Sequence, residues 1–249
     1  MRSDWPAAIY LTRHAESAGN VARRRALEAR AETIDVSRRD VDVGLSELGE
    51  GQAAALGRWL ARNVEPLDAV LTSPYVRARR TAEIALDAAG WSGVGLVVDE
   101  RLREKELGAL DRLTRLGIER RYPEESAARA ELGKYWYRPP GGESWVDVIL
   151  RLRSLVEALR RDYAGRRLLV VAHQVVVLCM RAIVEGLGEH EILAIDRAGE
   201  VANCSLTTYE ADPHTGRPVL RGYNQVAHLA EEGERVTREP AATRTGSDG

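Results

Sequence analysis

Four short apolar runs, each next to a segment with helical periodicity, organise this chain. They cover residues 8–12, 69–72, 94–98 and 168–172. Apolar runs of this length without polar alternation are typical of strands buried on both faces of a sheet. Elsewhere, apolar positions recur every three to four residues, which predicts amphipathic helices. The predicted helices cover residues 46–63, 76–89, 145–163 and 175–184. This alternation predicts an α/β fold, a three-layer α/β/α sandwich around a mostly parallel central sheet.

Two segments depart from the alternation. Residues 103–144 hold two turn-rich sequences, Tyr122-Pro-Glu-Glu and Arg138-Pro-Pro-Gly-Gly, and are too long for a simple connection. We expect them to form a helical cap insertion over one edge of the sheet. Residues 231–249 lack apolar periodicity, which predicts a disordered tail, with a lid over the site as the alternative. No linker divides the remainder, so we expect one domain over residues 1–230.

The charge and the cysteines narrow the class of partner. A net charge of −2 with 30% charged residues gives no global basic field, so we expect no nucleic-acid partner. No apolar run reaches the roughly 18 residues of a membrane span, and no apolar leader precedes the first strand. We therefore expect a cytoplasmic protein without a membrane partner. Cys179 and Cys204 lack metal-like spacing and are expected to be buried thiols, with no metal and no cofactor. The sequence leaves open whether the chain forms a homodimer.

The first apolar run ends at Arg13 and His14. The ends of parallel strands are where α/β proteins bind ligands. A neutral histidine there is a competent nucleophile toward phosphorus, and an arginine beside it neutralises phosphoryl oxygens. In a chain this rich in arginine, however, roughly 0.7 such pairs would arise by chance. The pair therefore predicts phosphoryl transfer only if other segments converge on it.

Three further segments do converge. The fourth apolar run also ends in a histidine, His173, at the start of a predicted helix. Arg77 opens the helix after the second run and can bind an anion through two nitrogens. Right-handed crossovers place these strand ends on one edge of the sheet. A leaving oxygen needs a carboxylic acid to protonate it; Glu104 follows the third run, and Glu106 is a rival that spacing alone does not exclude.

These residues resemble the signature of the histidine phosphatase superfamily, the group related to phosphoglycerate mutases. The family motif is Arg-His-Gly-Glu with an asparagine four residues later; here it stands as Arg13-His14-Ala15-Glu16 followed by Asn20, with alanine replacing glycine. The resemblance implies that His14 is phosphorylated and that Arg13, Arg77 and His173 form the phosphate pocket, with Asn20 as a further ligand. It also selects Glu104, because the acid of the family lies four residues before a glycine.

The cap is similar to that of fructose-2,6-bisphosphatase domains. The shared pattern consists of Tyr122-Pro-Glu-Glu, Arg129, Lys134-Tyr135, Pro140, Gly142-Glu-Ser144 and His173-Gln174. In those domains the counterparts of Arg129, Lys134 and Gln174 hold the sugar bisphosphate, which makes these residues candidate substrate ligands. Only two of the 36 basic residues are lysines, which favours a dedicated role for Lys134, although a solvated cap lysine is an equal alternative.

Several positions depart from that pattern. Arg115 stands where the family has a substrate tyrosine, and it becomes a candidate ligand for a second phosphate. Trp145 replaces another tyrosine, and Leu178 replaces an arginine. The residues of this sequence hold no phosphate-binding loop of the Gly-x-x-x-x-Gly-Lys-Ser/Thr type, so we expect a stand-alone phosphatase without the kinase half of the bifunctional relatives. Ser17 is a candidate donor to phosphate, with a helix N-cap as the alternative.

The residues and the resemblance together predict a phosphomonoesterase. Its expected substrates are small phosphorylated metabolites, namely sugar, polyol or acid phosphates, hydrolysed through a phosphohistidine on His14 without a metal. The first alternative is a cofactor-dependent phosphoglycerate mutase, which returns the phosphate to a bound intermediate. The second is a non-catalytic binder of phosphate ligands, a class that usually lacks the nucleophile or the acid. Both residues are present here.

Overall fold

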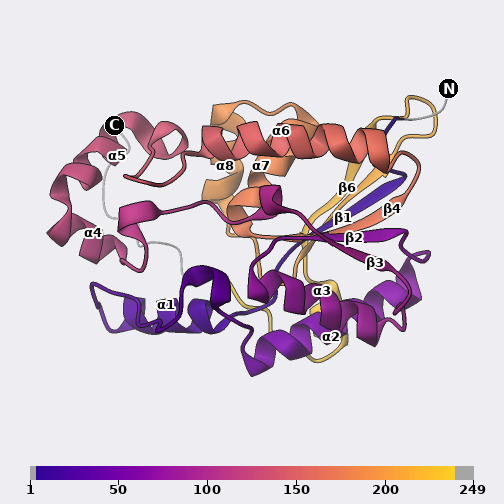
Figure 1. Ribbon diagram of the computed structural model, residues 1–249, viewed down its shortest axis with the longest axis horizontal. Coiled ribbons are helices and arrows are strands. Elements are labelled where there is room, and N and C mark those ends of the chain that lie inside the picture. Colours follow the sequence, from indigo (N-terminus) through magenta and orange to yellow (C-terminus); the bar gives the residue numbers. More distant parts are fainter. Residues whose placement is uncertain (1–3, 239–249) are drawn as a thin grey trace.

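The computed structural model describes residues 4–238, and its centre is a six-stranded sheet (Figure 1). The strand order is β3-β2-β4-β1-β5-β6. The bounds are Ala8–Arg13 for β1, Ala69–Thr72 for β2, Gly95–Val98 for β3, Arg167–Ala172 for β4, Leu206–Ala211 for β5 and Pro218–Gln225 for β6. Strands β1 to β4 run parallel, and β5 is antiparallel to both of its neighbours. The predicted mostly parallel sheet is confirmed.

Helices cover both faces of the sheet, which confirms the three-layer sandwich (Figure 1). One face carries α2 (Glu47–Asn63) and α3 (Val76–Ala88). The other carries α6 (Trp145–Asp162), α7 (Gln174–Glu185) and α8 (Glu189–Ala198). Helix α1 (Ala18–Glu28) follows β1 and lies beyond the edge of the sheet, toward the cap (Figure 1). The short helix α9 (Ala227–Glu231) contacts α2. Within residues 4–238, no helix has both the length and the apolar character needed to cross a membrane.

Strand β1 shows why its sequence is apolar without interruption. Successive side chains of a strand point to opposite faces. Ile9 and Leu11 pack with α6 and α7, whereas Ala8 and Tyr10 pack with α2 and α3. Every residue of β1 is therefore buried. Neither face of the strand is open to solvent, so no position favours a polar residue. The apolar sequence therefore continues to the end of the strand.

The register of the strands sets the position of the catalytic candidates. Arg13 pairs with Ala172, and Thr72 pairs with Val171. The residues that follow these strands are His14, His173 and Ser73, so they lie together at one edge of the sheet. Helix α2 packs closely against the loop after β1: a Cβ at Gly49 would lie 1.9 Å from the carbonyl oxygen of Glu16. Only glycine permits this approach.

The predicted helical cap lies at one end of the molecule (Figure 1). It contains the 3-10 helix η3 (Gly108–Leu110), followed by α4 (Arg115–Arg121) and α5 (Pro123–Trp136). A further 3-10 helix, η2 (Glu100–Leu102), precedes the cap and buries Leu102 in the core. Thr114 is the N-cap of α4, and its hydroxyl accepts a hydrogen bond from the amide of Gly117 at 3.1 Å. Gly117 is the one fully buried residue of α4, and α5 has none. The cap is thus a largely exposed layer.

The expected disorder from residue 231 onward needs a correction as far as residue 238. Thr237 is only 5% exposed. Its hydroxyl donates to Oδ1 of Asn203 at 3.2 Å and accepts from Nε2 of Gln52 at 3.1 Å. The segment is held by polar contacts of this kind, which a search for apolar periodicity does not detect. The boundary placed at residue 230 therefore falls inside packed structure, and residues 239–249 lie outside the described residues.

Candidate active site

His14 is placed at the edge of the sheet by strand β1 and is only 3% exposed. Its Nδ1 lies 2.8 Å from the carbonyl oxygen of Ala15. A carbonyl can only accept a hydrogen bond, so Nδ1 carries the proton and Nε2 keeps its lone pair. Nε2 in turn accepts a hydrogen bond from Nε of Arg77 at 3.2 Å. The ring is therefore fixed in the tautomer that can attack through Nε2.

The surroundings of His14 keep this ring neutral. Burial lowers its pKa well below the usual 6.5, and the positive charges of Arg77 and Arg13 lower it further. The hydrogen bond to Ala15 opposes this effect. Because a protonated imidazole has no free lone pair, a lowered pKa preserves the nucleophile at neutral pH.

His173 is the last residue before α7 and lies next to His14. The two rings meet edge to face, with 5.1 Å between their centroids. Nε2 of His173 lies 2.8 Å from Oγ of Ser73, whereas its Nδ1 is buried and has no hydrogen-bond partner among the described residues. Burial, followed by the charge of Arg77, holds the pKa of His173 well below 6.5. An unpaired buried nitrogen is costly, so this atom fits a bound ligand.

Arg13 ties three segments together at this edge. Its side chain is buried, and Nη1 donates to Oε1 of Gln174 at 3.0 Å and to the carbonyl oxygen of Val201 at 2.7 Å. Strand β1, helix α7 and the loop before β5 thus meet at one guanidinium. Gln174, expected to be a sugar ligand, is placed beside the pocket and accepts from Arg13.

Arg77 lies in the first turn of α3 and uses every nitrogen of its guanidinium. Nε faces His14, while Nη1 and Nη2 lie 3.0 and 2.9 Å from the two carboxylate oxygens of Asp40. Nη1 also donates to the backbone carbonyl of Asp40 at 2.7 Å. Asp40 begins a 3-10 helix, η1 (Asp40–Asp42). Asp40 stands in a polar stretch without a recognised motif, so the sequence alone does not indicate its contact with Arg77.

Glu104 and its rival Glu106 have different environments. Burial raises the pKa of the Glu104 carboxyl above its usual value, and a hydrogen bond from the amide of Lys105 at 2.7 Å partly offsets this. The charges of Arg77 and Arg13 also act on Glu104, which places it beside the pocket. Glu106 is exposed and accepts a hydrogen bond from the hydroxyl of Tyr75 at 2.9 Å. Glu104 is the better placed acid.

The loop carrying Glu104 is held by an arginine that the sequence analysis did not single out. Nε of Arg151 lies 2.9 Å from Oε1 of Glu143, and its Nη2 donates to the backbone carbonyl of Glu104 at 3.3 Å. Glu143 also binds Arg103 at 2.6 Å. This network fixes the backbone on both sides of the acid. Long-range pairs of this kind leave no local signal in the sequence.

Ser17 is the N-cap of α1 and Asn20 lies in its first turn, and together they form a capping box. The Ser17 hydroxyl accepts from the amide of Asn20 at 3.2 Å, and Asn20 Oδ1 accepts from the amide of Ser17 at 3.0 Å. Asn203 donates both to Asn20 Oδ1 at 3.2 Å and to the carbonyl oxygen of His14 at 3.1 Å. The N-cap alternative for Ser17 is present in the structure. Contacts of either residue with phosphate stay a prediction.

The cap cations differ from the pocket residues. Nζ of Lys134 lies 2.5 Å from Oδ2 of Asp196 on α8, and Arg115 pairs with Glu119 along α4 at 2.7 Å. Arg129 is exposed on α5 and has no ion-pair partner among residues 4–238. The structure thus gathers the five catalytic candidates, but it shows Lys134 and Arg115 engaged with acidic side chains of their own.

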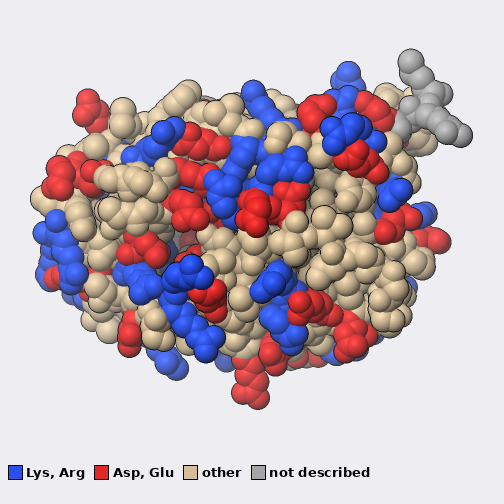
Figure 2. Space-filling view, in the orientation of Figure 1, with Lys and Arg blue, Asp and Glu red and all other residues tan. Residues whose placement is uncertain are grey.

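Lys105, which the sequence analysis did not single out, lies between Glu104 and the cap cations. Burial lowers the pKa of its ammonium group to about 8, and the charges of Arg129 and Lys134 add to the effect. Glu104 and Glu143 act in the opposite direction. Lys105 therefore lies close enough to Glu104 and to the cap cations for their charges to interact. On the face drawn in Figure 2, basic and acidic side chains are interspersed.

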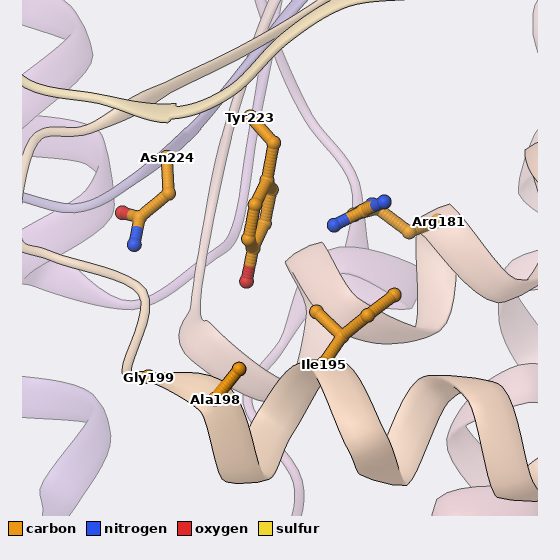
Figure 3. Close-up of a pocket in the computed structure, with 6 residues that line it drawn as sticks. All are labelled: Arg181, Ile195, Ala198, Gly199, Tyr223 and Asn224. Atoms are coloured by element: carbon orange, nitrogen blue, oxygen red, sulfur yellow. The ribbon is translucent and has the colours of Figure 1, made fainter.

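A cavity of about 410 Å³ lies away from this cluster, between α7, α8 and β6 (Figure 3). Its lining includes Arg181, whose guanidinium stacks on the ring of Tyr223 at 4.0 Å and pairs with Glu185 at 2.7 Å. Its cation is thus already neutralised. The cavity shares no lining residue with the site around His14. Among residues 4–238, no group of three or more His, Cys, Asp or Glu side chains is arranged to hold a metal ion.

Relatives of known name match most of the chain. A protein of Photorhabdus laumondii named "Probable phosphoglycerate mutase" is 32% identical over 203 residues, which cover 80% of this chain and 82% of that protein. The 6-phosphofructo-2-kinase/fructose-2,6-bisphosphatase of Gallus gallus is 34% identical over 178 residues. This match covers 71% of the present chain but 32% of the bifunctional protein.

A solved structure and a family profile complete the comparison. The mycobacterial glucosyl-3-phosphoglycerate phosphatase in complex with VO3 superimposes with a TM-score of 0.69 at 28% identity. The match covers 88% of this chain and all of that one. The family described as "Histidine phosphatase superfamily (branch 1)" matches residues 9–225, from the first residues of β1 to the end of β6. The chain therefore belongs to the histidine phosphatase superfamily.

Proposed function

We propose that this chain is a phosphomonoesterase that hydrolyses small phosphorylated metabolites through a phosphohistidine on His14. The observation that carries the proposal is the fixed tautomer of His14. Its Nδ1 is bound to the Ala15 carbonyl, and its Nε2 faces Arg77 in a pocket with Arg13 and His173. A nucleophile with a lone pair, surrounded by cations and by a buried unpaired nitrogen, suits a phosphoryl group.

In the first step, Nε2 of His14 forms a bond to phosphorus while the bond from phosphorus to the leaving oxygen breaks. Glu104 gives its proton to that oxygen, so an alcohol leaves rather than an alkoxide. The raised pKa of Glu104 favours the protonated form that this step requires. Arg13 and Arg77 compensate the negative charge on the phosphoryl oxygens.

In the second step, water attacks phosphorus and the bond to Nε2 breaks. The carboxylate of Glu104, left without its proton, takes one from the attacking water. Inorganic phosphate forms, and His14 and Glu104 return to their starting states. One carboxyl group thus serves both half-reactions.

The names of the relatives support the substrate class. They include a phosphatase of glucosyl-3-phosphoglycerate and a fructose-2,6-bisphosphatase, whose substrates are acid and sugar phosphates. The neighbouring cations Lys105 and Arg129 suit a second anionic group on such a substrate. A mutase is the second candidate, because several relatives carry that name. In a mutase the phosphohistidine returns its phosphate to a bound molecule instead of water.

A screen of phosphorylated metabolites for release of inorganic phosphate tests the proposal. We expect hydrolysis of p-nitrophenyl phosphate and of at least one sugar or acid phosphate, and a loss of about 10³-fold or more in His14→Ala. His190→Ala is the matched control, because His190 is exposed on α8 and should leave activity unchanged. Full activity in His14→Ala would exclude a phosphohistidine. Interconversion of 2- and 3-phosphoglycerate faster than their hydrolysis would identify a mutase.

A further inference from the structure

The side chain of Asp40 holds the part of Arg77 that faces away from the nucleophile. Both carboxylate oxygens bind the two terminal nitrogens of the guanidinium, at 3.0 and 2.9 Å. The side chain of Arg77 is 7% exposed, whereas that of Asp40 is 47% exposed. A buried cation is thus bound by an anion that comes from the solvent side.

This arrangement resembles the binding of a phosphate. The planar fork of an arginine binds two oxygens of a carboxylate or of a phosphate with the same geometry. Nε of the same guanidinium lies 3.2 Å from Nε2 of His14, the atom that would attack phosphorus. A phosphoryl group that enters this position meets an arginine whose terminal nitrogens already hold a carboxylate.

We propose that Asp40 competes with the phosphoryl group for Arg77 and sets the affinity of the site for both substrate and product. This inference rests on the proposed function, because it assumes that phosphate binds next to His14. Phosphate binding then includes the release of the Asp40 carboxylate from the terminal nitrogens of Arg77. The competition weakens the binding of substrate and of inorganic phosphate alike, so it also speeds the departure of the product.

The local structure allows this exchange without unfolding. Asp40 begins the three-residue helix η1, and its backbone carbonyl accepts from Nη1 of Arg77 at 2.7 Å. Rotation of the half-exposed side chain toward solvent releases the carboxylate while the backbone contact holds η1 in place. Asp42, two residues on, pairs with Arg39 at 2.8 Å instead of with Arg77. It provides a matched control in the same helix.

Asp40→Asn tests the proposal, with Asp42→Asn as the control. The variant keeps the shape of the side chain but removes its charge, so the competing bond becomes a weaker neutral one. We expect the inhibition constants for orthovanadate and inorganic phosphate, and the KM for p-nitrophenyl phosphate, to fall about tenfold in Asp40→Asn. Asp42→Asn should match the wild type. If Asp40→Asn does not fold, as judged by circular dichroism, Asp40→Ser provides the same comparison.

The outcomes separate this inference from the proposed function. Equal or higher inhibition constants in Asp40→Asn, in a protein that still hydrolyses p-nitrophenyl phosphate, would overturn the competition alone. A wild type that neither hydrolyses this ester nor binds orthovanadate would overturn the proposed function, and the inference with it. A tenfold fall in both inhibition constants with an unchanged Asp42→Asn supports the competition.

Discussion

The edge of the sheet and the cap place their charged residues by different means. His14 and His173 each follow a buried strand, and Arg77 lies on the buried side of α3, in its first turn; all three are at most 5% exposed. The backbone determines where these side chains begin, and close packing leaves them little freedom. In the cap, Arg115, Arg129 and Lys134 stand on α4 and α5, which bury almost nothing.

This difference assigns the chemical steps to the edge of the sheet and the choice of substrate to the cap. A reacting atom must be held within a fraction of an ångström, which strands and buried side chains can do. Long exposed side chains on a thin helical layer can exchange partners at a small cost in free energy. The ion pair between Lys134 and Asp196, whose lysine side chain is 40% exposed, is of this kind. We therefore expect changes at the edge to remove activity and changes in the cap to alter which substrate is preferred.

Glu104→Gln should give the largest effect among the changes that keep the nucleophile. Gln cannot donate a proton to the leaving oxygen, so kcat for alkyl phosphates should fall by about 10²- to 10⁴-fold. The loss should be much smaller with p-nitrophenyl phosphate, whose leaving group needs little protonation. Steady-state kinetics with both esters measures the ratio. Equal losses with the two esters would contradict the acid role, and Glu106→Gln is the control.

The pH dependence of kcat also tests the residues at the edge of the sheet, and we expect it to show a smaller effect than Glu104→Gln. Because the pKa of His14 is lowered, its ring stays neutral down to a pH well below 6.5. Because the pKa of Glu104 is raised, its carboxyl group keeps its proton to a pH above 4.5. We expect an optimum on the acidic side of neutrality for alkyl phosphates. Beyond it, kcat should fall about tenfold per pH unit as Glu104 ionises. This basic limb should disappear in Glu104→Gln; an alkaline optimum would contradict the assignment.

Arg129→Met should change selectivity and leave the chemistry intact. Arg129 is exposed, so its contact with a second anionic group is worth only about 1 kcal/mol, or roughly fivefold in KM. We expect this increase for a sugar bisphosphate, with kcat for p-nitrophenyl phosphate unchanged. Arg120→Met is the control, because Arg120 pairs with Glu32. A fall in kcat for both substrates would show that the cap takes part in catalysis.

Removal of metal ions should have no effect. The proposed steps use His14 and Glu104 as the groups that transfer phosphate and proton, and neither step requires a Lewis acid. Incubation with EDTA followed by assay of p-nitrophenyl phosphate hydrolysis should leave the rate within experimental error. Strong inhibition that Mg²⁺ or Zn²⁺ restores would contradict the proposed mechanism.

The predictions from sequence were most accurate for residues whose position depends only on the course of the backbone. The apolar runs located β1 to β4 to within one residue, and the shared edge of His14 and His173 followed from parallel pairing. Asp40 could not be found in this way. It meets Arg77 through side-chain geometry in a stretch without periodicity.

The cap and the C-terminal segment show the same limit. The resemblance indicated Lys134 as a ligand, but its ion pair with Asp196 joins residues 62 positions apart. Thr237 is packed through hydrogen bonds to Gln52 and Asn203, in a segment whose composition is typical of disorder. Contacts between polar residues distant in sequence form only in the complete fold, so no local sequence pattern predicts them.

The position of β1 in the sheet also affects how the protein is made. This strand is synthesised first, but its two neighbours are β4 and β5, which begin at Arg167 and Leu206. Until those residues emerge, an apolar strand has both edges unpaired, a state that invites association with other chains. Folding of the central sheet must therefore wait for most of the chain, and the nucleophile attached to β1 reaches its pocket late.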